Sequence, residues 1–174
     1  MDQAIKRAVS GLSSKEYGDI RIICGSEGLT KEKLDEYIRL VTTDRINLGL
    51  SFYGSAKKLD LKDDGDCRSI VSRCYYCCYH LTRALIFLVL RDDIGDHSRL
   101  PKVLEKVLTE EDNKFADRLD EWRGIRNEIE YSPFPKTDKP LDETAAEMLE
   151  GTREFMESFA PYFRERGVEI DARI

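Results

Sequence analysis

The stretch RNEIEYSPFP, from Arg126 to Pro135, combines residues that bind anions with residues that handle protons. Arg126 and Asn127 can grip an anion, because guanidinium and amide groups both present N–H donors. Glu130 and Tyr131 can orient a partner group or move a proton. The stretch is therefore either a working site or a polar helix end that is tied down before a loop.

A second set of polar residues stands at helical spacing earlier in the chain. Tyr76, His80 and Arg83 occupy positions i, i+4 and i+7, so they share one face of a predicted helix. Histidine is suited to proton transfer because its pKa lies near 6.5. We expect His80 and Arg83 to lie beside Arg126 in a groove.

Each of these residues also has a purely structural interpretation. Arg126 and Glu130 are four positions apart and can form an ordinary ion pair on one helix. Tyr131 can tether the helix end by a hydroxyl bond to another helix, and His80 can be a core histidine with satisfied hydrogen bonds. For His97, near the start of a short predicted helix, we expect bonds to nearby backbone, with contact to a ligand as the alternative.

Helical geometry limits how Arg126 and Tyr131 can act together. At about 100° per residue, the two residues lie roughly 140° apart on a regular helix. We therefore expect that they do not converge on one small ligand within a single helix. Convergence would need fraying near Ser132 or a second subunit related by a two-fold axis, so the pair makes more sense in a dimer.

The apolar pattern predicts the helices that must position these residues. Apolar side chains recur about every 3.6 positions in long stretches that end in loops. Thr30 is the expected N-cap of the first long helix, with Lys33 at the third helical position. A short helix with Pro101 in its first turn separates two long helices from two further ones, and these four are predicted over residues 30–61, 66–92, 109–131 and 141–163.

These elements predict an all-α fold, an antiparallel four- to five-helix bundle with a short N-terminal arm. The helix over residues 66–92 is apolar most of the way round, which is typical of a central helix. Residues 1–29 form the arm, in which a short amphipathic helix can be followed by an extended segment over residues 17–28. The bundle then covers residues 30–165 and a C-terminal tail covers residues 166–174.

The composition is that of one globular domain and argues against several classes of protein. Of the 174 residues, 41% are hydrophobic and 36% are charged, so the chain can bury a real core. A net charge of −6 argues against broad non-specific binding to nucleic acid, although bases outnumber acids between Asp66 and Arg91 and allow a local basic strip. The sequence has no candidate membrane span or signal peptide, so we expect a cytoplasmic protein with no membrane partner.

The five cysteines do not form a metal motif. Cys74, Cys77 and Cys78 fall on one predicted helix, and no second cluster completes a tetrahedral shell. We therefore expect small core-filling thiols and no metal. The sequence also has no glycine-rich phosphate loop and no nucleophile–base motif, so we expect no cofactor and find no support for an enzyme acting on a small metabolite.

Four motifs in order carry a resemblance to a known family. The stretch YYCCYHLTRALIFLVLRDDIGDHSRL has two aromatic residues, then a histidine with TRAL, then HSRL, and RNEIEY follows about thirty residues later. This pattern resembles the HEPN superfamily, and within it the UPF0332-type helical proteins. The resemblance covers about residues 39–163 and implies a four- or five-helix bundle that commonly dimerises.

The resemblance also implies an activity and a site. Many HEPN proteins are metal-independent endoribonucleases or toxins, often paired with small nucleotidyltransferases, and their site is an arginine followed four to six residues later by a histidine. Arg126 matches that arginine, whereas Tyr131 stands at the histidine position. Glu130 stands where the UPF0332-type pattern usually has aspartate.

Two hypotheses follow. In the first, the protein associates with RNA or nucleotides as a weak or degenerate endoribonuclease of toxin–antitoxin type. Such cleavage needs a base, an acid and a cation, and tyrosine is a poor base at neutral pH. The catalytic candidates are Arg126, Tyr131 and His80, and the ligand-binding candidates are Arg83, Asn127, Glu130, Tyr76 and His97.

In the second hypothesis, the protein is a non-catalytic dimeric interaction module that partners a small nucleotidyltransferase. The polar residues then fix only the register of the helices, and we expect a closed, ion-paired cluster without a cavity.

Overall fold

The computed structural model describes residues 3–19 and 30–170, and every regular element within them is helical. The elements are α1 (Gln3–Ser10), α3 (Lys31–Ala56), α4 (Asp64–Leu90), α5 (Leu100–Leu104), the 3-10 turn η1 (Glu111–Asn113), α6 (Lys114–Tyr131) and α7 (Leu141–Arg164). Residues 14–19 are also helical. The predicted all-α bundle is confirmed, whereas the extended segment considered for residues 17–28 lies outside the described residues from residue 20 onward.

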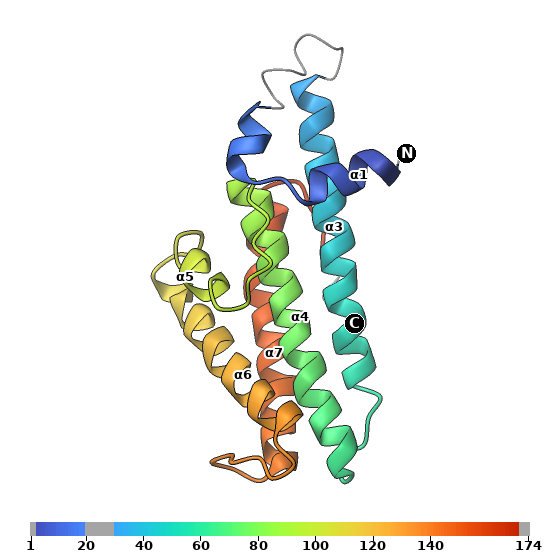
Figure 1. Cartoon of the computed structure of the whole chain (residues 1–174), viewed down its shortest axis with the longest axis vertical. Coiled ribbons are helices and arrows are strands. Elements are labelled where there is room, and N and C mark those ends of the chain that lie inside the picture. The colour runs from blue at the N-terminus through green and yellow to red at the C-terminus, as the bar shows by residue number, and fades with distance from the viewer. Residues whose placement is uncertain (1–2, 20–29, 171–174) are drawn as a thin grey trace.

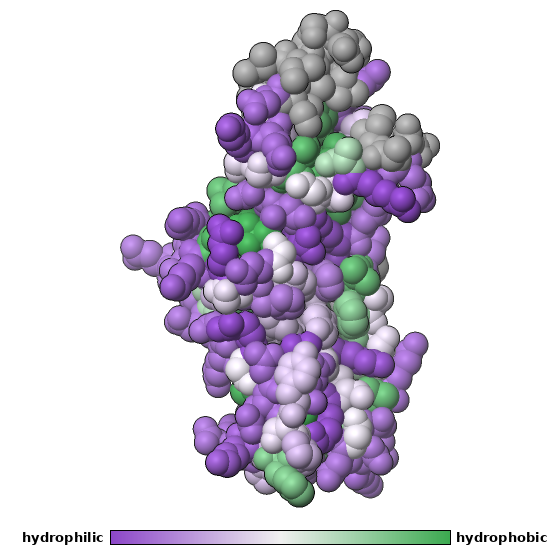
Figure 2. All heavy atoms as spheres, in the orientation of Figure 1, coloured by the Kyte–Doolittle hydropathy of each residue, from purple (hydrophilic) through white to green (hydrophobic). Residues whose placement is uncertain are grey.

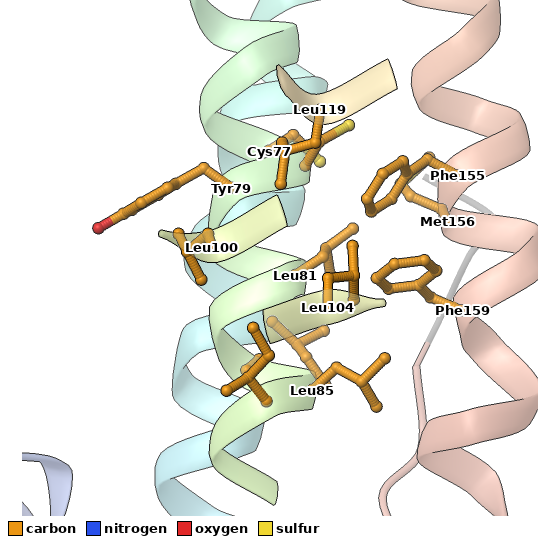
Figure 3. Packing of buried hydrophobic residues seen from close by; sticks show 14 of the residues in the cluster. Cys77, Tyr79, Leu81, Leu85, Leu100, Leu104, Leu119, Phe155, Met156 and Phe159 are labelled. Atoms are coloured by element: carbon orange, nitrogen blue, oxygen red, sulfur yellow. The ribbon is translucent and has the colours of Figure 1, made fainter. Parts of the chain in front are cut away.

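α4 is the central helix of the bundle. α3 lies along one side of it and α6 along the other, while α7 packs behind (Figure 1). Its leucines and cysteines pack toward Phe155 and Phe159 of α7 (Figure 3). Because three helices cover α4, its polar side chains are left partly exposed mainly along the seam between α3 and α6.

The helix ends follow local capping chemistry. The Thr30 hydroxyl accepts a bond of 3.3 Å from the Lys33 amide, which confirms the predicted N-cap of α3. α3 ends at Ala56, short of the predicted residue 61. Leu59 continues the apolar spacing but packs against the core from a turn, so periodicity alone placed the helix end too late.

The cysteines of α4 are buried among apolar side chains. Cys67, Cys74, Cys77 and Cys78 are all free thiols in the core. Burial raises the pKa of Cys74 to about 12, because a thiolate is poorly solvated there. These thiols are therefore unreactive packing groups, as the sequence indicated.

The outer surface in the view of Figure 2 is mostly hydrophilic, with small separate hydrophobic patches. Among the helices in the described part of the chain, none has the length and apolarity to cross a membrane.

A close approach between α6 and α7 depends on a glycine. Trp122 of α6 is buried, and its ring lies against Gly151 of α7. A Cβ atom at Gly151 would stand 2.8 Å from a carbon of that ring, closer than packed carbons allow. Gly151 is thus more than a mildly unfavourable helix residue, since it makes room for Trp122.

Replacing Gly151 with alanine should lower the free energy of unfolding by about 1–3 kcal/mol, because the added methyl overpacks the contact with Trp122. The matched control is Gly124→Ala in α6, where a Cβ would meet nothing within 4 Å. That variant should raise the free energy by up to about 1 kcal/mol through helix propensity. Urea denaturation measures both values, and a shift of the same sign in both variants would contradict the packing argument.

Candidate functional site

Arg126 of α6 lies among three tyrosines at the seam with α4. Its Nη2 atom donates a hydrogen bond to the Tyr76 hydroxyl. The guanidinium carbon lies 4.9 Å from the ring centroid of Tyr76, 5.5 Å from that of Tyr131 and 5.8 Å from that of Tyr75. A cation over aromatic faces is stabilised by the ring quadrupoles. The Arg126 side chain is consequently only 12% exposed.

The two terminal nitrogens of Arg126 also have partners on its own helix, whereas its buried Nε atom has none among the described residues. Nη2 lies 2.7 Å from Glu130 Oε2, so the ion pair that the spacing allows is present. Nη1 donates to Asn127 Oδ1 at 2.9 Å. The Ser72 hydroxyl of α4 donates to the second Glu130 oxygen. The structure thus brings together Arg126, Asn127 and Glu130, and the guanidinium is already engaged.

The Arg126 and Tyr131 side chains approach each other within one helix, while their convergence on one ligand stays a prediction. Although their Cα atoms are separated around the helix axis, the Tyr131 ring lies within cation–π distance of Arg126. Helical side chains lean toward the N-terminus, so the Tyr131 ring covers the preceding turn, where the long Arg126 side chain can reach it.

The end of α6 is tied down by an arginine that the sequence analysis did not single out. Arg68 of α4 donates to the carbonyl oxygens of Ile129 at 2.6 Å and Ser132 at 3.1 Å. These bonds satisfy acceptors that a helix end leaves without partners. Tyr131 is 75% exposed, so Arg68 rather than Tyr131 tethers this helix end.

His97 lies inside the aromatic cluster, although the sequence favoured a backbone-bonding role for it. Its Nδ1 atom is 2.7 Å from the Tyr75 hydroxyl, and its ring stacks on Tyr79 at 4.0 Å. The Tyr76 ring meets it edge-on at 6.2 Å. Burial lowers the pKa of His97, and the charge of Arg126 lowers this pKa further. The imidazole is therefore neutral at neutral pH and can accept a proton.

Side chains of α4 position the loop that carries His97. Arg83 binds both carboxylate oxygens of Asp93, each at 2.7 Å. Tyr79 points away from the apolar core (Figure 3), and its hydroxyl donates to the Gly95 carbonyl at 3.1 Å. Arg83 therefore holds a loop in place here, and this loop sets where the His97 ring lies.

His80 lies apart from Arg126, in a groove between α1, α3 and α4. Its ring stacks on Phe52 of α3 at 5.6 Å with an interplanar angle of 7°. Burial, followed by the charges of Arg83 and Arg45, lowers the pKa of His80 to about 4. His80 and Arg83 line a groove that α1 closes, and Arg126 is not among its lining residues. His80 and Arg83 therefore do not lie beside Arg126 as expected. His97 is the histidine that lies against the same tyrosine as Arg126.

Two tyrosines of the cluster, Tyr75 and Tyr79, are not among the candidate site residues of the sequence. Tyr75 and Tyr79 stand at i and i+4, and both use their hydroxyls, one toward His97 and one toward Gly95. The signal that could have identified them is their spacing of four residues on a helix that also carries Tyr76. Among the described residues, no three His, Cys, Asp or Glu side chains are grouped to hold a metal ion.

Acidification should destabilise the protein through His80. Its pKa in the folded chain is about 4, below the ordinary value of 6.5, so between these pH values the unfolded chain binds a proton that the folded chain does not. The free energy of unfolding should therefore fall as the pH drops from about 7 to about 5. His80→Phe keeps an aromatic ring on Phe52 and should reduce this fall, measured by urea denaturation at each pH.

The control for that experiment is a substitution at a position that contacts no histidine. Thr152→Val removes a buried hydroxyl that donates to the Met148 carbonyl and contacts no carboxylate or histidine among the described residues, so its effect on stability should not change with pH in this window. If the difference between wild type and His80→Phe is the same at both pH values, the assigned state of His80 is incorrect.

Comparison with known proteins agrees with this architecture. The model of the HEPN domain matches residues 43–161, which is well over half of the chain and spans α4, the His97 loop and α6. No significant match was found among curated proteins or among solved structures. On the strength of the domain match, the chain belongs to the HEPN family.

Proposed function

We propose that this protein associates with RNA through the cluster around Arg126 and that His97 is its proton carrier. The observation that supports this most is the placement of Arg126 and a neutral His97 against the same tyrosines, Tyr75 and Tyr76. An arginine can bind a phosphate through two parallel bonds. A neutral imidazole can take a proton at neutral pH, which tyrosine does poorly.

The proposed reaction is cleavage of RNA without a metal. His97 accepts the proton of a 2′-hydroxyl through Nε2, since Nδ1 is bonded to Tyr75. The 2′-oxygen forms a bond to phosphorus, the bond to the 5′-oxygen breaks, and the leaving oxygen takes a proton from the exposed Tyr131 hydroxyl or from water. Arg126 stabilises the charge that develops on the phosphoryl oxygens.

The ion pair with Glu130 makes this a weak site. A phosphate must compete with the Glu130 carboxylate, which lies 2.7 Å from Arg126 and is also held by Ser72. Releasing a partly buried carboxylate from its partner is unfavourable. The proposed activity is therefore low, in keeping with a degenerate endoribonuclease of toxin–antitoxin type in the UPF0332-type branch.

The proposal includes a homodimer in the cytoplasm. Tyr131 is 75% exposed and Phe134 is 86% exposed, so two large aromatic side chains lie next to the site without cover from the described residues. Exposed aromatic groups are enriched where protein surfaces meet. A second copy across this surface would bring two Arg126 sites toward one RNA strand.

A non-catalytic interaction module is the second candidate. The engaged, 12% exposed Arg126 side chain favours it, because a closed ion-paired cluster is what such a module needs. In that case the exposed Tyr131 and Phe134 contact a protein, such as a small nucleotidyltransferase, and RNA binding is absent.

The test compares RNA affinity and RNA cleavage in the presence of a metal chelator. Arg126→Gln should weaken binding of a short single-stranded RNA about tenfold, by loss of charge-assisted bonds. His97→Gln should lower the cleavage rate about 100-fold and leave the affinity within about twofold. Fluorescence anisotropy measures binding, and gel analysis of labelled RNA measures cleavage.

Arg164→Gln is the matched control, since it removes the same charge from an exposed arginine at the end of α7. Its affinity and rate should equal those of wild type. If Arg126→Gln binds RNA as well as wild type but sediments as a different oligomer, the interaction module is the correct function.

A further inference from the structure

A groove lies between α1, α3 and α4, separate from the Arg126 cluster. It has a volume of about 610 Å³, and its walls include Lys6 and Arg7 of α1, Arg45 of α3, and His80 and Arg83 of α4. That volume falls in the range of small-molecule sites, roughly 300–1,000 Å³. The match to the HEPN domain begins at residue 43, so the α1 wall is an addition to the family domain.

The α1 wall is fixed to the bundle by specific bonds. Lys6 pairs with Asp44 at 2.7 Å, and Arg45 donates to the Ser10 carbonyl at 2.6 Å. The Asp93 amide donates to the Leu12 carbonyl at 3.1 Å. The apolar side chain of Leu12 is buried in the core. The groove is consequently a built feature of the fold, with walls from three helices.

Positive charge in the groove exceeds negative charge. Arg45 and Arg83 share one carboxylate, Asp93, at 2.9 Å and 2.7 Å. Lys6 is neutralised by Asp44, whereas Arg7 forms no ion pair with any residue that the structure describes. The lining therefore carries a net charge of about +2 in a chain whose net charge is −6.

One buried donor of the groove lacks a partner in the described part of the chain, although Arg45 pairs with Asp93 through its other terminal nitrogen. Arg45 is 9% exposed, and among the described residues its Nη1 atom has no hydrogen-bond partner. Burial and the charge of Arg83 lower the pKa of Arg45 to about 10, against the opposing effect of Asp93. The charges of Arg83 and Arg45 also lower the pKa of His80. An anion in the groove would offset the repulsion between Arg45 and Arg83 and would supply a partner for Arg45 Nη1.

We propose that this groove binds a small phosphate-bearing anion. A di- or trianionic group matches the net charge of about +2 better than a carboxylate does, and guanidinium groups bind phosphate oxygens through paired N–H donors. Arg7 contacts the anion from α1, and Arg83 with Arg45 contacts it from the bundle. This site is independent of the proposed RNA cleavage at Arg126.

The two histidines of the chain allow a direct test, because His80 reports on the groove and His97 on the Arg126 cluster. Inorganic pyrophosphate is added to the full chain while imidazole signals are followed by NMR. The His80 signals should shift saturably and the pKa of His80 should rise, since a bound anion favours the protonated ring. His97 should move much less. Unchanged His80 signals would overturn the proposal.

Variants locate the anion. Arg7→Gln should weaken pyrophosphate binding about fivefold by loss of one nearby charge. Arg7 is exposed and has no ion-pair partner among the described residues, so this variant should keep the fold, which the Leu12 signals verify. Arg164→Gln should bind as wild type does. Equal affinities for Arg7→Gln and wild type would also overturn the proposal.

Two further measurements show which kind of phosphate the groove binds and whether this binding depends on the proposed RNA site. An oligonucleotide with a 5′-phosphate that shifts His80 more strongly than pyrophosphate identifies the end of a nucleic-acid strand as the ligand. A weaker effect than that of pyrophosphate identifies a free small anion. Arg126→Gln should retain pyrophosphate binding, so failure of one site leaves the other standing, and loss of binding in that variant would contradict a separate groove.

Discussion

The burial of α4 on almost every side is the constraint on which the rest of the structure depends. Because α3, α6 and α7 all pack on this helix, its polar side chains can reach solvent mainly along one seam. Tyr76, His80 and Arg83 share that seam for this reason. The contacts of each side chain then depend on which neighbouring element packs against α4 at that residue.

Distance along α4 divides the seam into two sites. Tyr76 and Arg83 are seven residues apart, which is about 10 Å along the axis at 1.5 Å per residue. α6 lies beside the lower part of α4 and diverges from it higher up, where the loop before α5 and the helix α1 lie instead (Figure 1). Arg126 therefore meets Tyr76, whereas Arg83 meets Asp93. Residues that share one face of a helix therefore need not contribute to the same ligand site.

Most of the helices and the central position of α4 could be predicted from the sequence, because apolar periodicity and capping residues such as Thr30 are local signals. The same holds for the ion pair of Arg126 with Glu130, which needs only a spacing of four. The positions of His97 and Arg68 could not be predicted in this way. A loop has no periodicity, and Arg68 bonds to carbonyls more than sixty positions away, so both depend on how the helices pack.

Although Tyr131 stands where a histidine is expected, the loop between α4 and α5 brings a histidine close to Arg126. Tyr131 and Arg126 both lie on α6, whereas His97, which contacts the same tyrosines as Arg126, comes from the loop that follows α4. The place of His97 then depends on the bonds of Arg83 to Asp93 and of Tyr79 to Gly95.

Asp93 is also the carboxylate that neutralises Arg45 in the groove beside α1. The loop that presents His97 is therefore anchored in the same charge cluster that forms the second groove. Asp93 therefore contributes both to the wall of that groove and to the anchoring of the loop that carries His97. Through Arg45 and Asp93 the loop that carries His97 is also connected to the N-terminal segment, because Arg45 donates to the Ser10 carbonyl and the Asp93 amide donates to the Leu12 carbonyl.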